Sequence, residues 1–162
     1  MSLKKWTGVV GVFAAMVVAP TSFAKDSTDL NCPSGTRQER KANKKLGDMA
    51  ACIKADVKEF TPHGTTVYFH PNGMKQAEGL SENGLRMGLW TFFDEKGQKT
   101  GTANFKRSNF HGEVTELFAS GTVKKVEQYA DGLRQGMVKE FSADGRLVKQ
   151  TEYRDNREVA AK

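Results

Sequence analysis

Glycine recurs with a period of 24 residues between residues 64 and 145 of this 162-residue chain. Two columns of the period hold glycine in every repeat: Gly64, Gly88, Gly112 and Gly136 in the first, and Gly73, Gly97, Gly121 and Gly145 in the second. A third column reads Gly84, Ser108, Gly132 and Asn156, in which three members are glycine or asparagine, the residues that best tolerate a positive φ. Glycine recurs too often for long helices, so the period predicts tandem units that bend at fixed points and pack on one another.

The columns between the glycines hold side chains that favour strands. The sixth position is large and apolar, the third is β-branched or aromatic, and the eighteenth is aromatic in three repeats: Phe69, Phe93, Leu117 and Phe141; Thr66, Trp90, Val114 and Val138; Ser81, Phe105, Tyr129 and Tyr153. Turn sequences such as residues 70–73 lie between two apolar stretches and end on the second glycine column, which indicates β-hairpins. In a regular strand, positions three and six would face opposite sides of the sheet, yet both are mainly apolar. This requires either a bulge between them or partial cover on both faces of the sheet.

Residues 88–112 carry the fullest form of the repeat. They read Gly88-Leu-Trp90-Thr-Phe-Phe93, followed by Gly97, Phe105 and Gly112, and the same pattern continues over residues 112–129 and 136–153. The pattern resembles the bacterial variant of the MORN repeat over residues 64–155, with departures at Ser81, Ser108, Asn156, Thr66, Val114 and Val138. The resemblance implies a mainly β fold, an elongated antiparallel sheet of stacked hairpins, and a relationship to antitoxin-like members of that family. We expect four repeats, at residues 64–87, 88–111, 112–135 and 136–159.

The first 24 residues have the composition of a signal peptide. Lys4 and Lys5 precede an apolar run over residues 6–19, and residues 22–24 form a small-x-small cleavage site before Lys25. This run is shorter than the roughly 20 residues that span a bilayer, which favours cleavage over a permanent anchor. We therefore expect a bacterial protein that works in the periplasm or outside the cell.

Residues 25–63 precede the repeats and contain both cysteines, Cys32 and Cys52. Two thiols in an exported chain predict one disulfide, which closes a loop of about 20 residues. Apolar residues over 46–60 fit either an amphipathic helix, interrupted at Gly47, or part of a disulfide-clipped hairpin that extends the sheet. The hairpin is preferred because it continues a single architecture, and either structure would cap the first repeat.

The chain is modestly basic. It has 25 Lys and Arg against 19 Asp and Glu, and removal of the signal peptide would leave a net charge of +4. The densest basic patch comprises Arg37, Arg40, Lys41, Lys44 and Lys45, the candidate contact with an anionic membrane or cell-wall surface. No aromatic residue lies near this patch in the sequence, so nucleic acid is not an expected partner.

The residues that catalysis needs are scarce. His63, His70 and His111 are the only histidines, and none neighbours a nucleophile such as Ser120, so we expect no catalytic residue, no metal site and no cofactor. The glycine spacing is not that of a phosphate-binding loop. Five glutamates are expected on the surface in cross-strand pairs with lysines: Glu113, Glu116, Glu127, Glu140 and Glu152.

These observations favour a non-catalytic protein that binds another protein or acts as a scaffold in the bacterial envelope, since repeat stacks create long surfaces. The candidate contact residues belong to the types that dominate interfaces: Tyr68, Trp90, Phe92, Phe110 and Arg134. For Tyr68 and Trp90 a place in the core is the competing interpretation. Two alternative functions are peripheral association with an anionic surface and neutralisation of an exported toxin by an immunity protein.

Overall fold

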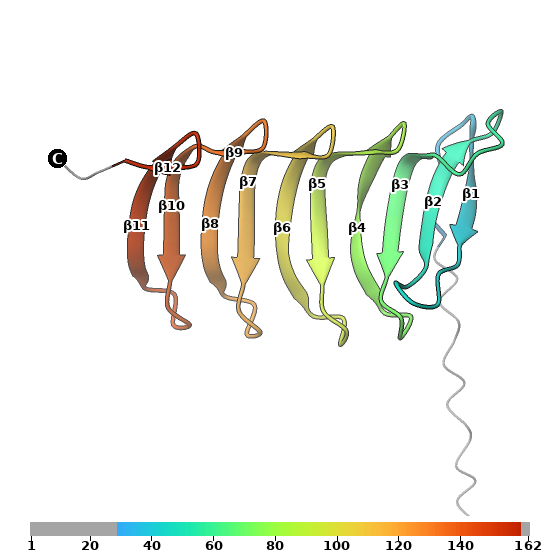
Figure 1. Cartoon of the computed structure of the whole chain (residues 1–162). Coiled ribbons are helices and arrows are strands. Elements are labelled where there is room, and N and C mark those ends of the chain that lie inside the picture. Colours follow the sequence, from blue (N-terminus) through green and yellow to red (C-terminus); the bar gives the residue numbers. More distant parts are fainter. Residues whose placement is uncertain (1–28, 160–162) are drawn as a thin grey trace, which may run out of the picture.

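The structure is a computed structural model that describes residues 29–159. These residues form one antiparallel sheet of 12 strands and no helix (Figure 1). The strands are β1 (Thr36–Lys41), β2 (Met49–Lys54), β3 (Pro62–Phe69), β4 (Lys75–Glu82), β5 (Leu85–Phe93), β6 (Lys99–Lys106), β7 (Asn109–Leu117), β8 (Val123–Ala130), β9 (Leu133–Arg134), β10 (Gly136–Phe141), β11 (Leu147–Arg154) and β12 (Arg157–Glu158). The predicted signal peptide, residues 1–24, lies outside the described residues. In the described part of the chain, no helix is long and apolar enough to cross a membrane.

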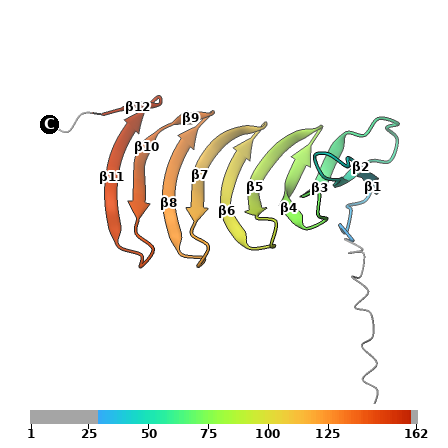
Figure 2. The ribbon, with the colours of Figure 1, turned by 60° about the horizontal axis from the view of Figure 1, so that its bottom comes forward.

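The order of the strands in the sheet follows the order of the chain. Each strand pairs with the next through a hairpin, except that the short β9 and then β10 both lie beside β8. Figure 2 shows the strands of the repeats curving in the same sense, with no second layer of described residues over them. The predicted fold, an open sheet of stacked hairpins, is therefore confirmed.

The second glycine column occupies the same position in all four repeats. Each of its glycines closes the longer hairpin turn of its repeat at a φ between 80° and 87°. In the first repeat the Gly73 N–H donates to the His70 carbonyl, and the His70 N–H donates to the Met74 carbonyl, both at 2.8 Å. The same pair of hydrogen bonds recurs in the other three turns. Glycine is favoured here because a side chain strains the backbone at this φ.

The third column forms the shorter turns between repeats. Each is a two-residue turn with both residues at positive φ, as in a type I′ turn: Asn83-Gly84, Arg107-Ser108, Asp131-Gly132 and Asp155-Asn156. In every repeat the second residue donates its N–H to a carbonyl 22 residues earlier in the chain, for example Gly84 to Pro62 and Ser108 to Arg86. The turns therefore link neighbouring units along one edge of the stack.

A column of side chains adds a second link at the same edge. The Asn83 N–H donates to His63 Nδ1 at 3.3 Å, and the Asp131 N–H donates to His111 Nδ1 at 3.3 Å. For the turns of the second and fourth repeats the equivalent acceptors are Met87 Sδ, bound by the Arg107 N–H, and Gln135 Oε1, bound by the Asp155 N–H. His63 and His111 thus hold turns at equivalent positions, 48 residues apart.

Positions three and six of the repeat are both mainly apolar although a regular strand would place them on opposite faces. The structure shows both of the expected reasons, a bulge between them and cover on both faces of the sheet. The strand register shifts between positions five and six of every repeat: Tyr68/Phe69, Phe92/Phe93, Glu116/Leu117 and Glu140/Phe141. In the first repeat both faces are also covered, because Thr66 on one face and Val67 on the other are almost fully buried. Phe69 packs with Val67 in a core cluster completed by Leu30, Ala50 and Cys52.

The region before the repeats is a hairpin, so the alternative of a helix over residues 46–60 is wrong. β2 pairs with both β1 and β3, and its backbone groups are therefore used by the sheet. Gly47 adopts a φ of 90°, and a Cβ atom there would collide with the Phe69 carbonyl. Cys32 and Cys52 form the predicted disulfide, with their Cα atoms 5.5 Å apart.

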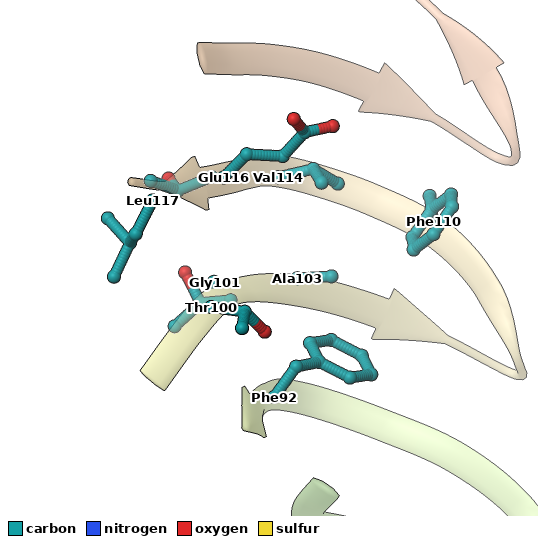
Figure 3. A pocket seen from close by; sticks show the side chains of 10 residues that line it. Phe92, Thr100, Gly101, Ala103, Phe110, Val114, Glu116 and Leu117 are labelled. Atoms are coloured by element: carbon teal, nitrogen blue, oxygen red, sulfur yellow. The ribbon is translucent and has the colours of Figure 1, made fainter. Parts of the chain in front are cut away.

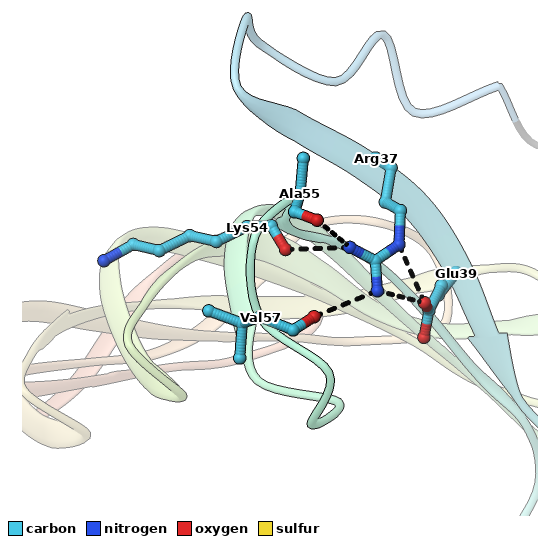
Figure 4. Close-up of polar contacts among 5 residues, drawn as sticks. All are labelled: Arg37, Glu39, Lys54, Ala55 and Val57. Carbon is cyan, nitrogen blue, oxygen red and sulfur yellow. Dashed lines mark hydrogen bonds and ion pairs between the residues drawn. The ribbon is translucent and has the colours of Figure 1, made fainter.

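Arg37 fastens the loop that joins β2 to β3. Its guanidinium donates to the carbonyls of Lys54, Ala55 and Val57 at 2.7 to 3.0 Å and pairs with Glu39 at 2.8 Å (Figure 4). Three loop carbonyls are thereby satisfied by one side chain of β1. Arg37 is a structural residue of the N-terminal cap.

Candidate functional site

A row of five aromatic rings crosses one face of the sheet from β3 to β8. The ring centroids are separated by 4.9 to 6.3 Å along the sequence of contacts Tyr68, Trp90, Phe105, Phe110 and Tyr129. These distances lie within the range at which aromatic pairs stabilise one another. We call this side of the sheet the aromatic face, and its row of rings joins three successive repeats.

Trp90, the second ring of this row, is completely buried. Its indole packs directly on Gly79, where any Cβ atom would collide with the ring, and its Nε1–H donates to the Leu80 carbonyl at 3.0 Å. Ala77, Ala103 and Phe105 complete the same core cluster. The side chain of Trp90 presents no surface to a partner, so its place is in the core.

Arg86 lies over the row of rings. Its guanidinium carbon is 5.3 Å from the centroid of Tyr68, 4.9 Å from that of Trp90 and 5.5 Å from that of Phe105. Contacts of this kind hold a cation over the faces of aromatic rings. No ion pair of Arg86 with a carboxylate occurs among residues 29–159, and its charge is half-buried at the surface of the aromatic face.

Three adjoining depressions run across the strands beside this row. The first lies between the cap and Arg86, the second between Tyr68 and Phe92, and the third between Phe92 and Phe110, with volumes of about 520, 400 and 370 Å³. Tyr68 and Arg86 line both the first and the second, and Phe92 lines both the second and the third. Figure 3 shows Phe92 and Phe110 on β5 and β7, with Gly101 and Ala103 on the strand between them. The three depressions together form one trough, the candidate binding site.

The trough ends where the face becomes charged. Glu127 occupies the position that holds Gly79 and Ala103 in the first two repeats and is 6% exposed. Its carboxylate lies 2.9 Å from Lys125 Nζ and 3.2 Å from Arg134 Nε. Burial lowers the pKa of Lys125, but the hydrogen bond and charge of Glu127 outweigh this effect and raise it above its ordinary value. The prediction that Glu127 lies on the surface is therefore wrong: its charge is buried between two cations.

The predicted basic patch is divided in the structure. Arg37 binds the loop after β2, and Arg40 pairs with Asp48 at 3.0 Å and covers the ring of Phe69. Lys41 lies 6.0 Å from the centroid of Phe60, and Lys44 and Lys45 are exposed in the turn between β1 and β2. Only part of the patch is therefore a solvent-facing surface.

The structure brings three of the five predicted contact residues to the trough, whereas Trp90 is buried and Arg134 lies beyond the end of the trough. Tyr68 and Phe92 line the trough, Phe110 lies at its far wall, and Arg134 covers the ring of Tyr153 at 4.9 Å. Sequence reasoning did not single out Arg86. Its column, which reads Arg86, Phe110 and Arg134 in three successive repeats, contains the signal that could have identified it.

Histidine and acidic side chains do not cluster into a metal-binding group in the described residues. Within residues 29–159 there is no group of three or more His, Cys, Asp or Glu side chains that could hold a metal ion. His70 Nε2 lies 3.0 Å from the Phe93 carbonyl, a contact between the first two longer turns.

No family model matches the chain, and a search of curated proteins finds no match.

Proposed function

We propose that this chain is a non-catalytic exported protein that holds another protein of the bacterial envelope in the trough of the aromatic face. The single observation that carries this proposal is the continuity of the three depressions, which share Tyr68, Arg86 and Phe92 as walls. Concave sites lined by apolar side chains with a few polar groups are typical binding sites. Aromatic and arginine side chains supply most of the binding energy at protein interfaces.

We also propose that the repeats are MORN-like and that the chain acts in an oxidising compartment after cleavage before Lys25. The disulfide between Cys32 and Cys52 is consistent with an exported location, since such bonds persist in oxidising environments. The 24-residue hairpin unit supports the family assignment, because each repeat places its glycines at the same turns.

Crosslinking in living cells tests the binding function. A photo-reactive amino acid is placed at residue 92, in the trough, and in a matched control at Leu89, which is 57% exposed on the opposite face of the same strand. The proposal predicts a saturable crosslinked product from residue 92 and none from residue 89, identified by mass spectrometry. Absence of a product from residue 92, or identical products from both residues, would contradict it.

A further inference from the structure

Large and small side chains alternate along the trough. The paired positions from β3 to β7 read Tyr68, Ala77, Phe92, Gly101 and Glu116. Every second strand therefore contributes a wall, and every strand between contributes a floor. With neighbouring strands ~4.8 Å apart, successive walls stand about 9.6 Å from one another.

This spacing discriminates between the conformations that a bound chain can adopt. A polyproline II helix repeats every three residues with a rise of about 3.1 Å, so its side chains return to one side every 9.3 Å or so. Side chains on one face of a strand recur every ~6.7 Å. In an α-helix the interval is about 5.4 Å for one turn, or ~10.5 Å for seven residues, in a rod about 10 Å wide. The polyproline II repeat fits the walls of the trough best.

Arg86 adds a charge requirement. It stands at the wall shared by the first two depressions, and the rings beneath it hold its guanidinium in place. No carboxylate among residues 29–159 forms an ion pair with it. A bound carboxylate would complete this group with charge-assisted hydrogen bonds. Two acidic residues line the trough, and each already lies beside a cation. Asp48, at the cap end, pairs with Arg40 at 3.0 Å, and Glu116, at the far end, lies 3.4 Å from Lys124.

We propose that the trough binds a proline-rich segment of a partner protein in the polyproline II conformation, with an acidic residue of that segment against Arg86. This inference rests on the proposed binding function and names its ligand class. Prolines one turn apart would lie on either side of Phe92, one between Tyr68 and Phe92 and the other between Phe92 and Glu116. A polyproline II segment is already ordered before binding, so it loses little entropy in a groove lined by aromatic side chains.

Fluorescence anisotropy with three labelled peptides tests the ligand. The first has two glutamates followed by nine prolines, the second replaces the prolines by alternating glycine and serine, and the third replaces the glutamates by lysines. The protein is the purified chain with its disulfide intact. We expect the first peptide to bind at least tenfold more tightly than the second and at least threefold more tightly than the third.

Substitutions locate the contact. Arg86→Gln should remove the preference for glutamate over lysine, and Phe92→Ser should weaken the first peptide at least fivefold. Leu89→Ser, on the opposite face of the same strand, should leave binding unchanged. If Phe92→Ser does not fold, an NMR titration of the unsubstituted protein takes the place of that variant. The first peptide should then shift the amide resonances of Tyr68, Phe92 and Thr100, which line the trough.

Equal binding of the first two peptides, or shifts confined to the opposite face, would overturn the proposal. So would displacement of the first peptide by phosphatidylglycerol vesicles, because the site would then recognise an anionic surface. Failure of the peptides together with a crosslink from residue 92 to a segment without proline removes this inference and keeps the proposed function. Failure of the peptides together with no crosslink from residue 92 removes both.

Discussion

The first two repeats and the last two share a backbone but differ in what fills the aromatic face. In the first two, the row along the trough reads Tyr68, Ala77, Phe92 and Gly101. In the last two, the equivalent positions are Glu116, Lys125, Glu140 and Lys149. The turns are the same in both halves, so the repeat geometry does not depend on the chemistry of the face. An apolar trough and a charged surface can therefore be built on one repeating frame.

The two halves also differ in the kind of side chain that each buries on the aromatic face. Trp90 sits in an apolar cluster with Ala103 and Phe105, whereas Glu127 is enclosed by Lys125 and Arg134. Apolar burial stabilises in proportion to the area removed from water, but a buried ion pair first has to recover the cost of desolvation. We therefore expect the first half, next to the disulfide, to be the more stable half.

The largest expected effect is that of Trp90→Ala. Removing a fully buried aromatic side chain costs about 3–5 kcal/mol of unfolding free energy. The matched change at the same repeat position in the last repeat, Val138→Ala, deletes only two buried carbons and should cost about 1.5 kcal/mol. Urea denaturation followed by tryptophan-independent far-UV circular dichroism measures both. Equal losses would show that the two halves do not differ as the packing indicates.

Loss of the disulfide should have the next largest effect and should be confined to the apolar half. Replacing Cys32 and Cys52 together by serine removes a constraint on a loop of about 20 residues, worth about 3 kcal/mol. Hydrogen exchange should then accelerate in β1 to β3, which hold the cluster around Phe69. Exchange in β10 and β11 serves as the internal control, and an equal acceleration there would contradict a local effect.

Glu127→Gln tests the charged half directly. It leaves Arg134 and Lys125 without their buried counter-charge, and we expect a loss of about 2 kcal/mol, because both cations keep some access to water. Glu152→Gln, an exposed glutamate on β11, is the control and should be close to neutral. A loss at Glu127 no greater than at Glu152 would mean that the buried pair does not support the fold.

Arg107→Asn should stabilise the protein. Arg107 adopts a φ of 51° in the short turn where the other repeats have asparagine or aspartate. Asparagine tolerates this conformation better than arginine, and the gain should be about 0.5–1 kcal/mol. Arg154→Asn, in the extended β11, should bring no gain. A stabilised Arg154 variant, or an unchanged Arg107 variant, would argue against turn strain as the cause.

The smallest effect concerns the titration of Lys125. Its pKa is raised above 10.5 in the folded chain, because Glu127 outweighs the burial that lowers it. A raised pKa in the folded state means that the contribution of Lys125 to stability is complete below pH 10.5 and is lost as the pH rises through the folded value. NMR titration should show this pKa fall in the Glu127→Gln variant. An unchanged value would assign the shift to another cause.

Much of the fold follows from local sequence. The second and third columns predict positive φ, and a turn at a fixed position is a property of two to four neighbouring residues. The disulfide was predicted from two thiols in a chain whose first 24 residues have the composition of a signal peptide. The helix alternative for residues 46–60 arose because the apolar spacing there fits two periodicities, and pairing of β2 with two neighbours decided between them.

The sequence predicted only part of the candidate binding site. Tyr68, Phe92 and Phe110 could be named by residue type, but their convergence with Arg86 depends on strand register, which shifts in every repeat. Glu127 could not be recognised as buried, because its burial depends on Arg134 of β9 and on its place opposite Val114 of β7. A one-residue change of register would have placed each of these side chains on the opposite face.

The sequence alone determined where the turns fall, and with them the number and length of the hairpins. The backbone preference of a glycine or asparagine is intrinsic to that residue. The tertiary structure alone decided which residues meet across strands: Trp90 over Gly79, Arg86 over three rings and Glu127 between two cations. The free energy of these contacts depends on burial and register, which exist only once the sheet has formed.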